Sequence, residues 1–391
     1  MMRNQACFIM FAVLLYALVS PGCGGPGADE LADAIADHRI GEVKELIAGG
    51  IDVNRYSESH RDDLITLAAG SGDPQMVKIL LEAGADPEGV TTPDRFPLLT
   101  AVKMPDAEII RMLAAAGADL ERPDEYGDTP LMVAADKGYQ EIVQMLLDLG
   151  ADPRGTDDQG DTALMSAVAS GQVEILRNLI SRGVPVDASD NRGWTPLMLA
   201  VSRLDCPVEI TRILLEKGAS TVAVNREGNT ALHLACAHAN ASHALELIKA
   251  GAAVDIPGDG NDTPLMLACG SHEGDPAETV KILLAAGAQV NSKNENGWTP
   301  LIHAAYMGNV GALTLLVNRK AALEAADQTG RTPLYHAAGN GRLECVKILL
   351  AAGARVDVVN ERGVGILQAV RNSSMTAKHQ IIRLLEDRGA K

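Results

Sequence analysis

The sequence predicts an all-α solenoid, in which helix-turn-helix units stack on one another around one elongated core. The first observation is a repeated motif: Asp-Thr-Pro-Leu at residues 128–131 returns at 161–164 as Asp-Thr-Ala-Leu and at 194–197 as Trp-Thr-Pro-Leu. This spacing of 33 residues indicates small units that bury their apolar faces only against their neighbours. The second observation is composition: 47% of the residues are hydrophobic but only 3% are aromatic, which favours small aliphatic side chains between short helices.

The N-terminal segment is predicted to be separate from the solenoid. Arg3 precedes an apolar stretch at residues 6–19, which has the length and order of a secretory signal and is too short to span a bilayer. Residues 1–22 are therefore predicted to be a signal peptide. Residues 23–30 are predicted to be an anchor cysteine followed by a flexible, glycine-rich tether.

The residues around Cys23 resemble the lipobox of bacterial lipoproteins, because the small residue Gly22 directly precedes the cysteine. The resemblance implies that Cys23 is lipidated and that the mature chain is an exported lipoprotein of the cell envelope, facing the periplasm or the exterior. Several acyl chains hold such a protein to the membrane durably. Ser20 and Pro21 depart from the usual lipobox residues, so ordinary signal cleavage followed by secretion is the alternative.

About eleven units follow in register over residues 31–391. Each is marked by an aliphatic residue at the position of the motif leucine: Leu31, Ile65, Leu98, Leu131, Leu164, Leu197, Leu232, Leu265, Leu301, Leu334 and Leu367. The first and last units lack Thr-Pro-Leu and carry charged side chains between their apolar positions, as polar capping repeats do. One solenoid domain therefore accounts for most of the chain.

The unit at residues 127–150 shows why each repeat is expected to fold as helix, turn, helix. The Thr129 hydroxyl can cap the first helix, and Pro130 occupies the first helical position, where its missing N–H costs nothing. Gly138 permits the chain reversal, and Gly150 ends the second helix. The apolar spacing between these two glycines gives the second helix one buried face.

These residues resemble the ankyrin repeat, whose pattern G-x-T-P-L-x-x-A-A, second helix and G-A-D is nearly complete in the units led by Leu131, Leu197, Leu301 and Leu334. The resemblance covers residues 31–391. It implies β-hairpin loops that project between the units, and a concave face of hairpin tips and inner helices that binds other proteins. Because ankyrin repeats are binding modules rather than catalysts, the resemblance also implies that the chain is not an enzyme.

Several units depart from this pattern. Phe96 replaces the capping threonine in one unit and Lys320 replaces the helix-ending glycine in another, so local looseness or strain is expected at both places. Three units are longer than the rest, with extra residues between their paired helices near 204–207, 272–276 and 372–374. Loops of this kind can carry additional contacts.

The formal net charge of −17 argues against nucleic acid or an anionic lipid surface as the main partner, because both reward clustered lysine and arginine. It favours a protein partner with a basic surface. The sequence contains no phosphate-binding P-loop, no H-E-x-x-H zinc helix and no G-x-S-x-G nucleophile elbow. We therefore expect no enzymatic activity, no cofactor, and membrane association through the lipid anchor only.

The cysteines and acidic hairpins are expected to be structural. Equivalent positions in stacked repeats lie about 8–10 Å apart, beyond the reach of an unstrained disulfide, so free thiols that fill the core are predicted. A site combining the cysteines with nearby histidines matches no standard zinc spacing, and the acidic hairpins fit turn geometry better than calcium ligation. No metal is predicted. The cysteines concerned are Cys206, Cys236, Cys269 and Cys345.

The residues expected to contact a partner stand at hairpin tips and at the ends of inner helices. Both tryptophans occupy the third hairpin position, three units apart, and an exposed tryptophan is a strong interface candidate. The alternative is that each indole packs on the neighbouring hairpin. The predicted partner-binding residues are Tyr126, Arg192, Trp194, Arg226, Trp298, Tyr306, Met307 and Arg331.

The resulting hypothesis is a monomeric, non-enzymatic scaffold that is exported, anchored to the membrane, and binds a protein partner on its concave face. A secreted effector that acts on a host or competitor protein is the alternative. The two differ in whether Cys23 carries lipid.

Overall fold

The computed structural model describes residues 27–89, 95–371 and 377–390. The predicted signal peptide and Cys23 lie outside these residues. The chain divides into two compact units, Met1–Ser166 and Ala167–Lys391, which we call the N-terminal unit and the C-terminal unit. None of the described helices is long and apolar enough to cross a membrane.

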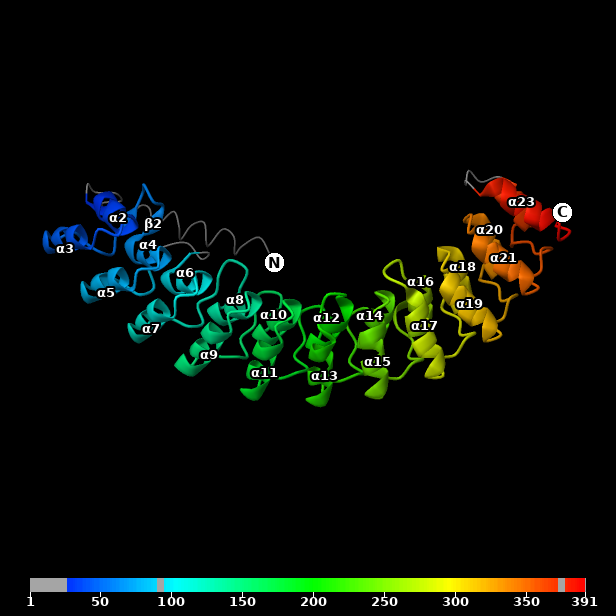
Figure 1. The fold of residues 1–391 in the computed structure, drawn as a ribbon, viewed down its shortest axis with the longest axis horizontal. Coiled ribbons are helices and arrows are strands. Elements are labelled where there is room, and N and C mark those ends of the chain that lie inside the picture. Colours follow the sequence, from blue (N-terminus) through cyan, green and yellow to red (C-terminus); the bar gives the residue numbers. More distant parts are fainter. Residues whose placement is uncertain (1–26, 90–94, 372–376, 391) are drawn as a thin grey trace, which may run out of the picture. The chain divides into compact units, whose positions relative to one another are not determined.

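The N-terminal unit contains four complete helix pairs (Figure 1). The first helix of each pair is an inner helix, which packs on its outer partner, and the four inner helices contact one another in series. The short strands β1 and β2 pair antiparallel, with Tyr56 opposite Asp63. The elements are α2 (Ala28–Ala36), α3 (Ile40–Ala48), β1 (Tyr56–Ser57), β2 (Asp62–Asp63), α4 (Leu64–Ser71), α5 (Pro74–Glu82), α6 (Pro97–Lys103), α7 (Ala107–Ala115), α8 (Pro130–Asp136) and α9 (Gln140–Leu149).

The C-terminal unit contains six complete pairs, and α10 (Ala163–Ala169), in which the division falls, forms the remaining pair with α11 (Val173–Ser181). The eleven pairs confirm the predicted number of repeats. The later elements are α12 (Pro196–Ser202), α13 (Val208–Glu216), α14 (Ala231–Ala237), α15 (Ala241–Lys249), the 3-10 helix η1 (Asp259–Asn261), α16 (Pro264–Gly270), α17 (Pro276–Ala285), α18 (Pro300–Met307), α19 (Val310–Asn318), α20 (Pro333–Gly339), α21 (Leu343–Ala351), α22 (Ile366–Arg371) and α23 (Lys378–Glu386).

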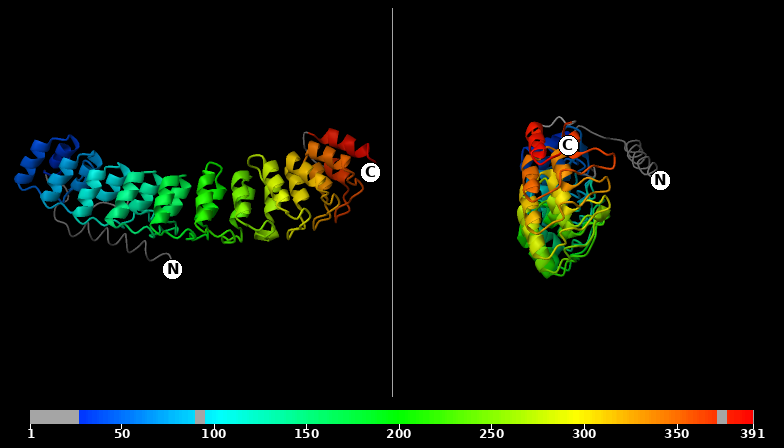
Figure 2. Two further views of the ribbon diagram at one scale, coloured as in Figure 1. Left: turned by 60° about the horizontal axis from the view of Figure 1, so that its bottom comes forward. Right: turned by 90° about the vertical axis from the view of Figure 1, so that its right-hand side faces the viewer.

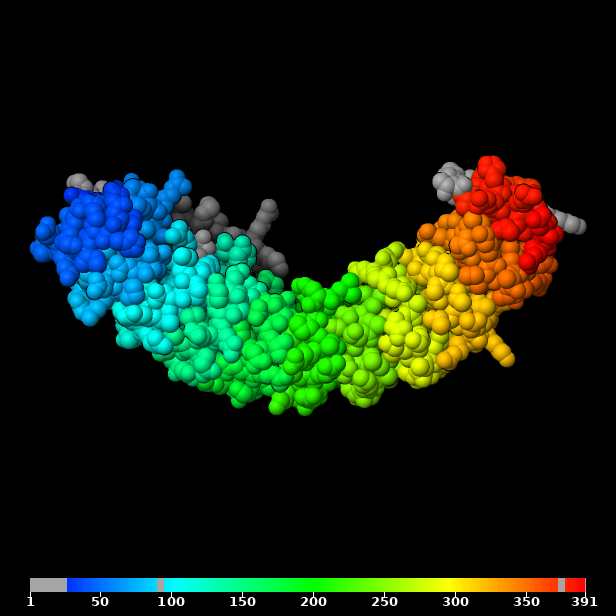
Figure 3. Space-filling view, viewed as in Figure 1, coloured from blue at the N-terminus to red at the C-terminus, as the bar shows by residue number. Residues whose placement is uncertain are grey.

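Stacking in the C-terminal unit follows one rule. Inner helices contact inner helices in series, and outer helices contact outer helices. In an end-on view the loops of this unit project from one side of the helices (Figure 2). Side chains fill the space between its neighbouring repeats (Figure 3), so its core is one continuous layer between two rows of helices.

The first repeat begins earlier than expected. Helix α2 starts at Ala28 and buries Leu31. Residues 28–30, predicted as the end of the tether, are therefore helical and belong to the first capping repeat.

Local chemistry starts and ends the helices as predicted. The Thr129 hydroxyl accepts a hydrogen bond from the backbone N–H of Met132, and Pro130 is the first residue of α8. Gly138 and Gly150 adopt the left-handed conformation, with φ of 74° and 105°, in which glycine pays no steric penalty. The same threonine cap recurs at Thr195, Thr263, Thr299 and Thr332.

Phe96 and Lys320 depart from the repeat in different ways. Phe96 precedes α6 without a side-chain cap, but its ring is buried and its centroid lies 4.6 Å from the Arg122 guanidinium carbon. Tight packing, rather than the expected looseness, replaces the missing cap. Lys320 has a φ of 59°, which confirms the expected strain and costs a non-glycine residue about 1 kcal/mol.

The loops between repeats are closed by a side chain at their first position. This aspartate or asparagine accepts hydrogen bonds from the backbone N–H groups two and four residues later. Asp190, for example, accepts from Arg192 and Trp194, each at 2.7 Å. The other residues in this role are Asp124, Asp157, Asn225, Asn294, Asp327 and Asn360.

Two kinds of hydrogen bond join neighbouring repeats in the C-terminal unit. In the first, a hairpin N–H donates to a carbonyl of the preceding hairpin, as Arg226 does to Arg192 at 2.9 Å. In the second, a polar side chain accepts from a backbone N–H of the following repeat, as Asp187 does from Ser220 at 2.9 Å. Further backbone links join Glu295 to Gly260, Gln328 to Asn296 and Glu361 to Thr329. Further side-chain links are Asp255 to Gln289, Asn291 to Ala322 and Glu324 to Arg355.

One interface lacks the backbone link. It lies between the hairpins at residues 225–229 and 258–262, and we call it the hairpin gap. The N–H of Asp259 lies 3.4 Å from the Asn229 side-chain oxygen, and among the described residues it donates to no carbonyl of the preceding hairpin. Gly258 stands where other hairpins have aspartate or asparagine. A Cβ on Gly258 would collide with the same Asn229 oxygen and lie 2.9 Å from the buried His233 ring, so a larger residue would force these side chains to move.

The hairpin gap also lacks the side-chain link, because Val222 stands at the position of Asp187 and cannot accept the N–H of Ala253. Val222 is 63% exposed, so replacing it costs little burial. Val222→Asp is expected to stabilise the C-terminal unit by about 1 kcal/mol, the usual net worth of one hydrogen bond. Urea unfolding of the full chain measures this change in the free energy of unfolding. Val224→Asp adds the same charge at an exposed neighbouring position as the control, and equal effects of the two would contradict the prediction.

Candidate functional site

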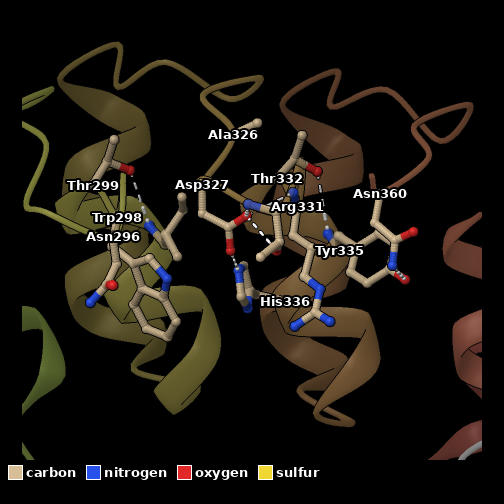
Figure 4. A network of polar contacts seen from close by, with 12 residues as sticks. Asn296, Trp298, Thr299, Ala326, Asp327, Arg331, Thr332, Tyr335, His336 and Asn360 are labelled. Carbon is tan, nitrogen blue, oxygen red and sulfur yellow. Dashed lines mark hydrogen bonds and ion pairs between the residues drawn. The ribbon is translucent and has the colours of Figure 1, made fainter. Parts of the chain in front are cut away.

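Four aromatic rings from two neighbouring repeats meet in the C-terminal unit. They are Trp298 in the hairpin before α18, His303 and Tyr306 on α18, and His336 on α20, and we call them the Trp298 cluster. Figure 4 shows Trp298 and His336. The Trp298 ring centroid lies 4.9 Å from that of His336, 5.0 Å from that of His303 and 5.1 Å from that of Tyr306. These are favourable aromatic separations, so one indole contacts rings of two neighbouring repeats.

Hairpin chemistry orients Trp298. The Asn294 side-chain oxygen accepts hydrogen bonds from the backbone N–H groups of Asn296 and Trp298, at 3.0 and 2.8 Å. Thr299 then caps α18. Because the turn is closed and the helix starts directly after Trp298, the backbone directs the indole onto the inner helices. The Trp298 side chain is half-buried there.

A buried carboxylate holds His336. The His336 Nε2–H donates to Asp327 Oδ2 at 2.8 Å, and both side chains are buried (Figure 4). Burial lowers the pKa of His336, and the Asp327 charge offsets part of that effect. Burial alone would raise the pKa of Asp327, but hydrogen bonds from Arg331, Thr329 and His336 outweigh it and hold that pKa below its usual value. Asp327 is therefore an ionised, buried anchor at neutral pH.

His303 has a looser carboxylate partner. Its Nε2 lies 3.6 Å from Asp262 Oδ1, and the Asn294 side-chain N–H donates to the same oxygen at 2.8 Å. Burial would raise the pKa of Asp262, but the interactions with His303 and Asn294 outweigh it and lower that pKa. Each imidazole of the Trp298 cluster therefore lies near a carboxylate, but only His336 is held by a hydrogen bond to it.

The Trp298 cluster is only partly covered. Trp298 is half-buried and Tyr306 is 39% exposed. Trp298 thus packs on a neighbouring repeat and also keeps an accessible part. Aromatic side chains held rigidly at a surface lose little entropy when a partner binds, and they dominate many protein interfaces. The chemistry available here is apolar and aromatic contact with a partner.

Trp194 has different neighbours. It is half-buried, and the Arg192 guanidinium carbon lies 5.5 Å from its ring centroid. Arg192 is fixed in turn by Asp190 at 2.7 Å. The structure therefore places two predicted residues together, Arg192 and Trp194, as a cation–aromatic pair separate from the Trp298 cluster.

The remaining predicted residues of the C-terminal unit vary in exposure. Arg331, half-buried, extends along the side of α20 that carries His336 (Figure 4), with its guanidinium carbon 5.7 Å from the Tyr335 ring centroid. Met307 is half-buried at the end of α18, and Arg226 is exposed. Trp298 and Tyr306 are thus the predicted pair that the fold brings into direct ring contact.

Tyr126 lies in the N-terminal unit, 62% exposed, within an acidic hairpin. Burial and, to a smaller extent, the charges of Asp124 and Asp157 together raise the pKa of Asp128 to about 6. The part of the rise that comes from repulsion between carboxylates is what a cationic partner would relieve. Among the described residues, no group of three or more histidine, cysteine or acidic side chains is arranged to hold a metal ion.

The structural role of His303 and His336 is not evident from sequence motifs, in which they could be interpreted only as possible metal ligands. The signal that could identify them is a change at one repeat position. The third residue of the inner helix, counted from the motif residue as one, is histidine in these two repeats and leucine or valine in five others, of which Leu67 in the repeat led by Ile65 is the first. The other four are Val133, Leu199, Leu234 and Leu267.

The cysteines of the repeats are free and buried, in the core position predicted for them. Burial raises the pKa of Cys206 and of Cys345 to about 11, and it raises the pKa of Cys236 and Cys269 as well. The four thiols therefore stay protonated at neutral pH. They are Cys206, Cys236, Cys269 and Cys345.

Comparison with known proteins agrees with this architecture. The family described as Ankyrin repeats (3 copies) matches residues 64–157, 149–225, 208–294 and 265–360. An ankyrin repeat and KH domain-containing protein of Caenorhabditis briggsae is 33% identical over 113 residues, which are 29% of this chain and 4% of that protein. The B-cell lymphoma 3 protein of Homo sapiens is 35% identical over 100 residues, which are 24% of this chain and 21% of that protein.

A solved structure shows the same fold. The crystal structure of the ankyrin repeat domain of Bcl-3, described as a unique member of the IkappaB protein family, aligns with a TM-score of 0.50 and 27% identity. The alignment covers 57% of this chain and 98% of that domain. The family match spans residues 64–360, and the structure supplies the stacked helix pairs that the family requires. The chain belongs to the ankyrin repeat family, whose repeats form protein-protein interaction scaffolds.

Proposed function

We propose that this protein is a non-enzymatic scaffold that binds a protein partner on the surface formed by its hairpins and inner helices. The Trp298 cluster carries the proposal. An indole braced by two imidazoles and a tyrosine, with Tyr306 39% exposed, offers a rigid apolar contact. The carboxylates beside the Trp298 cluster, Asp262 and Asp327, accept hydrogen bonds from within the protein. The aromatic rings of the cluster are therefore the groups proposed to contact the partner.

The partner is proposed to present a basic surface. The chain carries a formal net charge of −17. The pKa of Asp128 is raised to about 6, chiefly by burial and in part by repulsion from the neighbouring carboxylates. A cationic surface near this hairpin would remove that repulsion, and long-range attraction would speed association at low salt.

We also propose that the protein is exported and anchored through lipidated Cys23. The support is the order of Arg3, an apolar stretch and Gly22 before Cys23. Replacing Cys23 with alanine should move the protein from the membrane fraction to the soluble fraction and remove label from a radioactive fatty acid. Wild-type protein free in the culture supernatant would instead favour a secreted effector, the alternative that Ser20 and Pro21 support.

The scaffold proposal predicts that Trp194→Ala combined with Trp298→Ala abolishes partner capture. Crosslinking and pull-down from intact cell envelopes compare this variant with wild type, and circular dichroism checks that helix content is unchanged. Leu245→Ala, a change of a 37% exposed residue on the outer helix α15, is the matched control and should capture as wild type does. Identical captures by wild type and the double variant would move the binding surface elsewhere.

A further inference from the structure

A cleft of about 240 Å³ opens in the C-terminal unit at the ends of α14 and α16, beside the middle of α18. This volume is below that of sites for drug-sized ligands, about 300–1,000 Å³, and suits a single long side chain. Its lining combines apolar or small residues with polar side chains. It is lined by Ala237, His238, Leu267, Gly270, Ser271, His272, Glu273 and His303.

A missing side chain creates the hollow. Gly270 stands at the place that Tyr306 occupies in the next repeat, five residues after the motif leucine. A Cβ on Gly270 would lie 3.3 Å from His303 Nδ1, so any larger residue here would grow into the space beside that imidazole. His303 also contacts Trp298, at 5.0 Å between ring centroids. The cleft therefore borders the Trp298 cluster.

An inserted loop supplies the acidic wall. Residues 271–275 separate α16 from α17, whereas only residues 308–309 separate α18 from α19. The Ser271 hydroxyl accepts the N–H of Glu273 and donates to its carbonyl, and Asn309 donates to the Ser271 carbonyl at 3.1 Å. These bonds fix the backbone of the loop, and they hold Glu273 at the edge of the cleft.

Charge determines which side chain fits. The Glu273 carboxylate lies 2.8 Å from His238 Nδ1 and is exposed, and no lysine or arginine is among the lining residues. An aliphatic stem can lie on Leu267 while a cationic head meets Glu273. A guanidinium group suits this wall better than an ammonium group, because its planar face can also stack on an imidazole such as His303.

We propose that this cleft is a specificity pocket for one arginine side chain of the partner protein. The proposal rests on the scaffold function and adds what the partner must carry: an arginine next to an apolar residue that reaches the Trp298 cluster. A partner with lysine, or with a neutral residue of the same shape, binds more weakly.

Fluorescence titration of the full chain tests the pocket. The chain contains two tryptophans, so a Trp194→Phe background leaves Trp298 as the sole reporter, one ring from the cleft. The probes are three acetylated, amidated tripeptides, Leu-Arg-Leu, Leu-Lys-Leu and Leu-citrulline-Leu, of which citrulline keeps the shape of arginine without its charge. The arginine peptide should bind at least tenfold more tightly than the citrulline peptide and measurably more tightly than the lysine peptide. Equal binding of the three, or no saturable response to the arginine peptide, would overturn the proposal.

Two variants and a matched control locate the effect. Glu273→Gln removes the charge at an exposed position, and Gly270→Leu fills the hollow from the end of α16. Each should weaken arginine-peptide binding at least tenfold. Gly339→Leu adds the same side chain at the equivalent place in α20, where no atom lies within 4 Å of a Cβ, and should stay within twofold of wild type. Unchanged binding in Gly270→Leu would rule out the cleft.

The outcome for the pocket is separable from the outcome for the scaffold. If pull-down loses the partner in the tryptophan double variant but keeps it in Glu273→Gln and Gly270→Leu, the scaffold stands and the pocket fails. If the arginine peptide binds as expected while the tryptophan double variant still captures the same protein, the pocket stands and the proposed binding surface fails.

Discussion

Replacing Gly127 with alanine is expected to destabilise the N-terminal unit by about 3 kcal/mol. Gly127 closes its hairpin with a φ of 88°, and an added Cβ would lie 2.5 Å from the backbone nitrogen of Asp158 in the next hairpin. The left-handed conformation alone costs a residue with a side chain about 1 kcal/mol. The remaining cost arises because the close neighbour is backbone, which cannot rotate away as a flexible side chain can.

Substitution of a second glycine distinguishes the cost of the left-handed conformation from the cost of the close backbone contact. Gly150 has a φ of 105°, and a Cβ there would meet no atom within 4 Å. Gly150→Ala should therefore cost only about 1 kcal/mol. Urea unfolding of the full chain, followed by circular dichroism, compares the two variants with wild type. If both lose the same stability, the hairpins of this unit are not packed as closely as the structure shows.

The repeat architecture could be predicted because each repeat contains the residues that start and end its own helices. Thr129, Pro130 and Gly150 act through bonds within their own helix and its ends, and each does in the structure what its chemistry predicts. The count of eleven repeats follows from the same local signals. Phe96 shows the limit of this reasoning, because its burial beneath Arg122 depends on a neighbouring repeat.

The hairpin gap could not be predicted from any single repeat. The side-chain link that Val222 fails to make would end on Ala253, more than 30 residues later, and its existence elsewhere becomes visible only when stacked repeats are seen together. Gly258 carried a signal in the sequence, since a glycine replaces the aspartate or asparagine that closes other hairpins. Its consequence, the loss of the backbone link, depends on the spacing between hairpins.

The candidate site was predictable in part. The repeat positions of Trp298 and Tyr306 place both on the binding surface, and the structure brings them to 5.1 Å between ring centroids. The contribution of His336 comes from the next repeat, and its partner Asp327 reaches it across nine residues of hairpin and helix. Such a contact follows from how the repeats stack, which residue spacing alone does not give.

Removing the Asp327 side chain is expected to disrupt the Trp298 cluster and to cost the C-terminal unit about 3 kcal/mol. One carboxylate oxygen accepts from the backbone N–H groups of Thr329 and Arg331, at 2.8 and 3.0 Å, and from the Thr329 hydroxyl. The other accepts from His336 Nε2 at 2.8 Å. Alanine leaves these donors without their partner, and each buried unsatisfied group costs about 1–3 kcal/mol.

Replacing Asp327 with asparagine distinguishes the contribution of its hydrogen bonds within the turn from the contribution of its negative charge. Asn225, Asn294 and Asn360 close equivalent hairpins, so Asp327→Asn keeps the turn bonds and should cost less than about 1.5 kcal/mol. It removes the charge that partly offsets the effect of burial on His336, and the pKa of His336 should fall further below its usual value of 6.5.

The sign of the pH effect follows from that shift. When the folded-state pKa of a histidine is lowered, the unfolded chain binds the proton more readily, so stability decreases as pH falls through the usual value of 6.5. Asp327→Asn should therefore lose more stability than wild type between pH 7 and pH 5, whereas Asp327→Ala should already be destabilised at pH 7. Urea unfolding at both pH values, with Trp298 fluorescence in a Trp194→Phe background, measures the two effects. Parallel pH profiles for wild type and Asp327→Asn would show that this carboxylate does not set the charge state of His336, and the Trp298 cluster would then depend on ring packing alone.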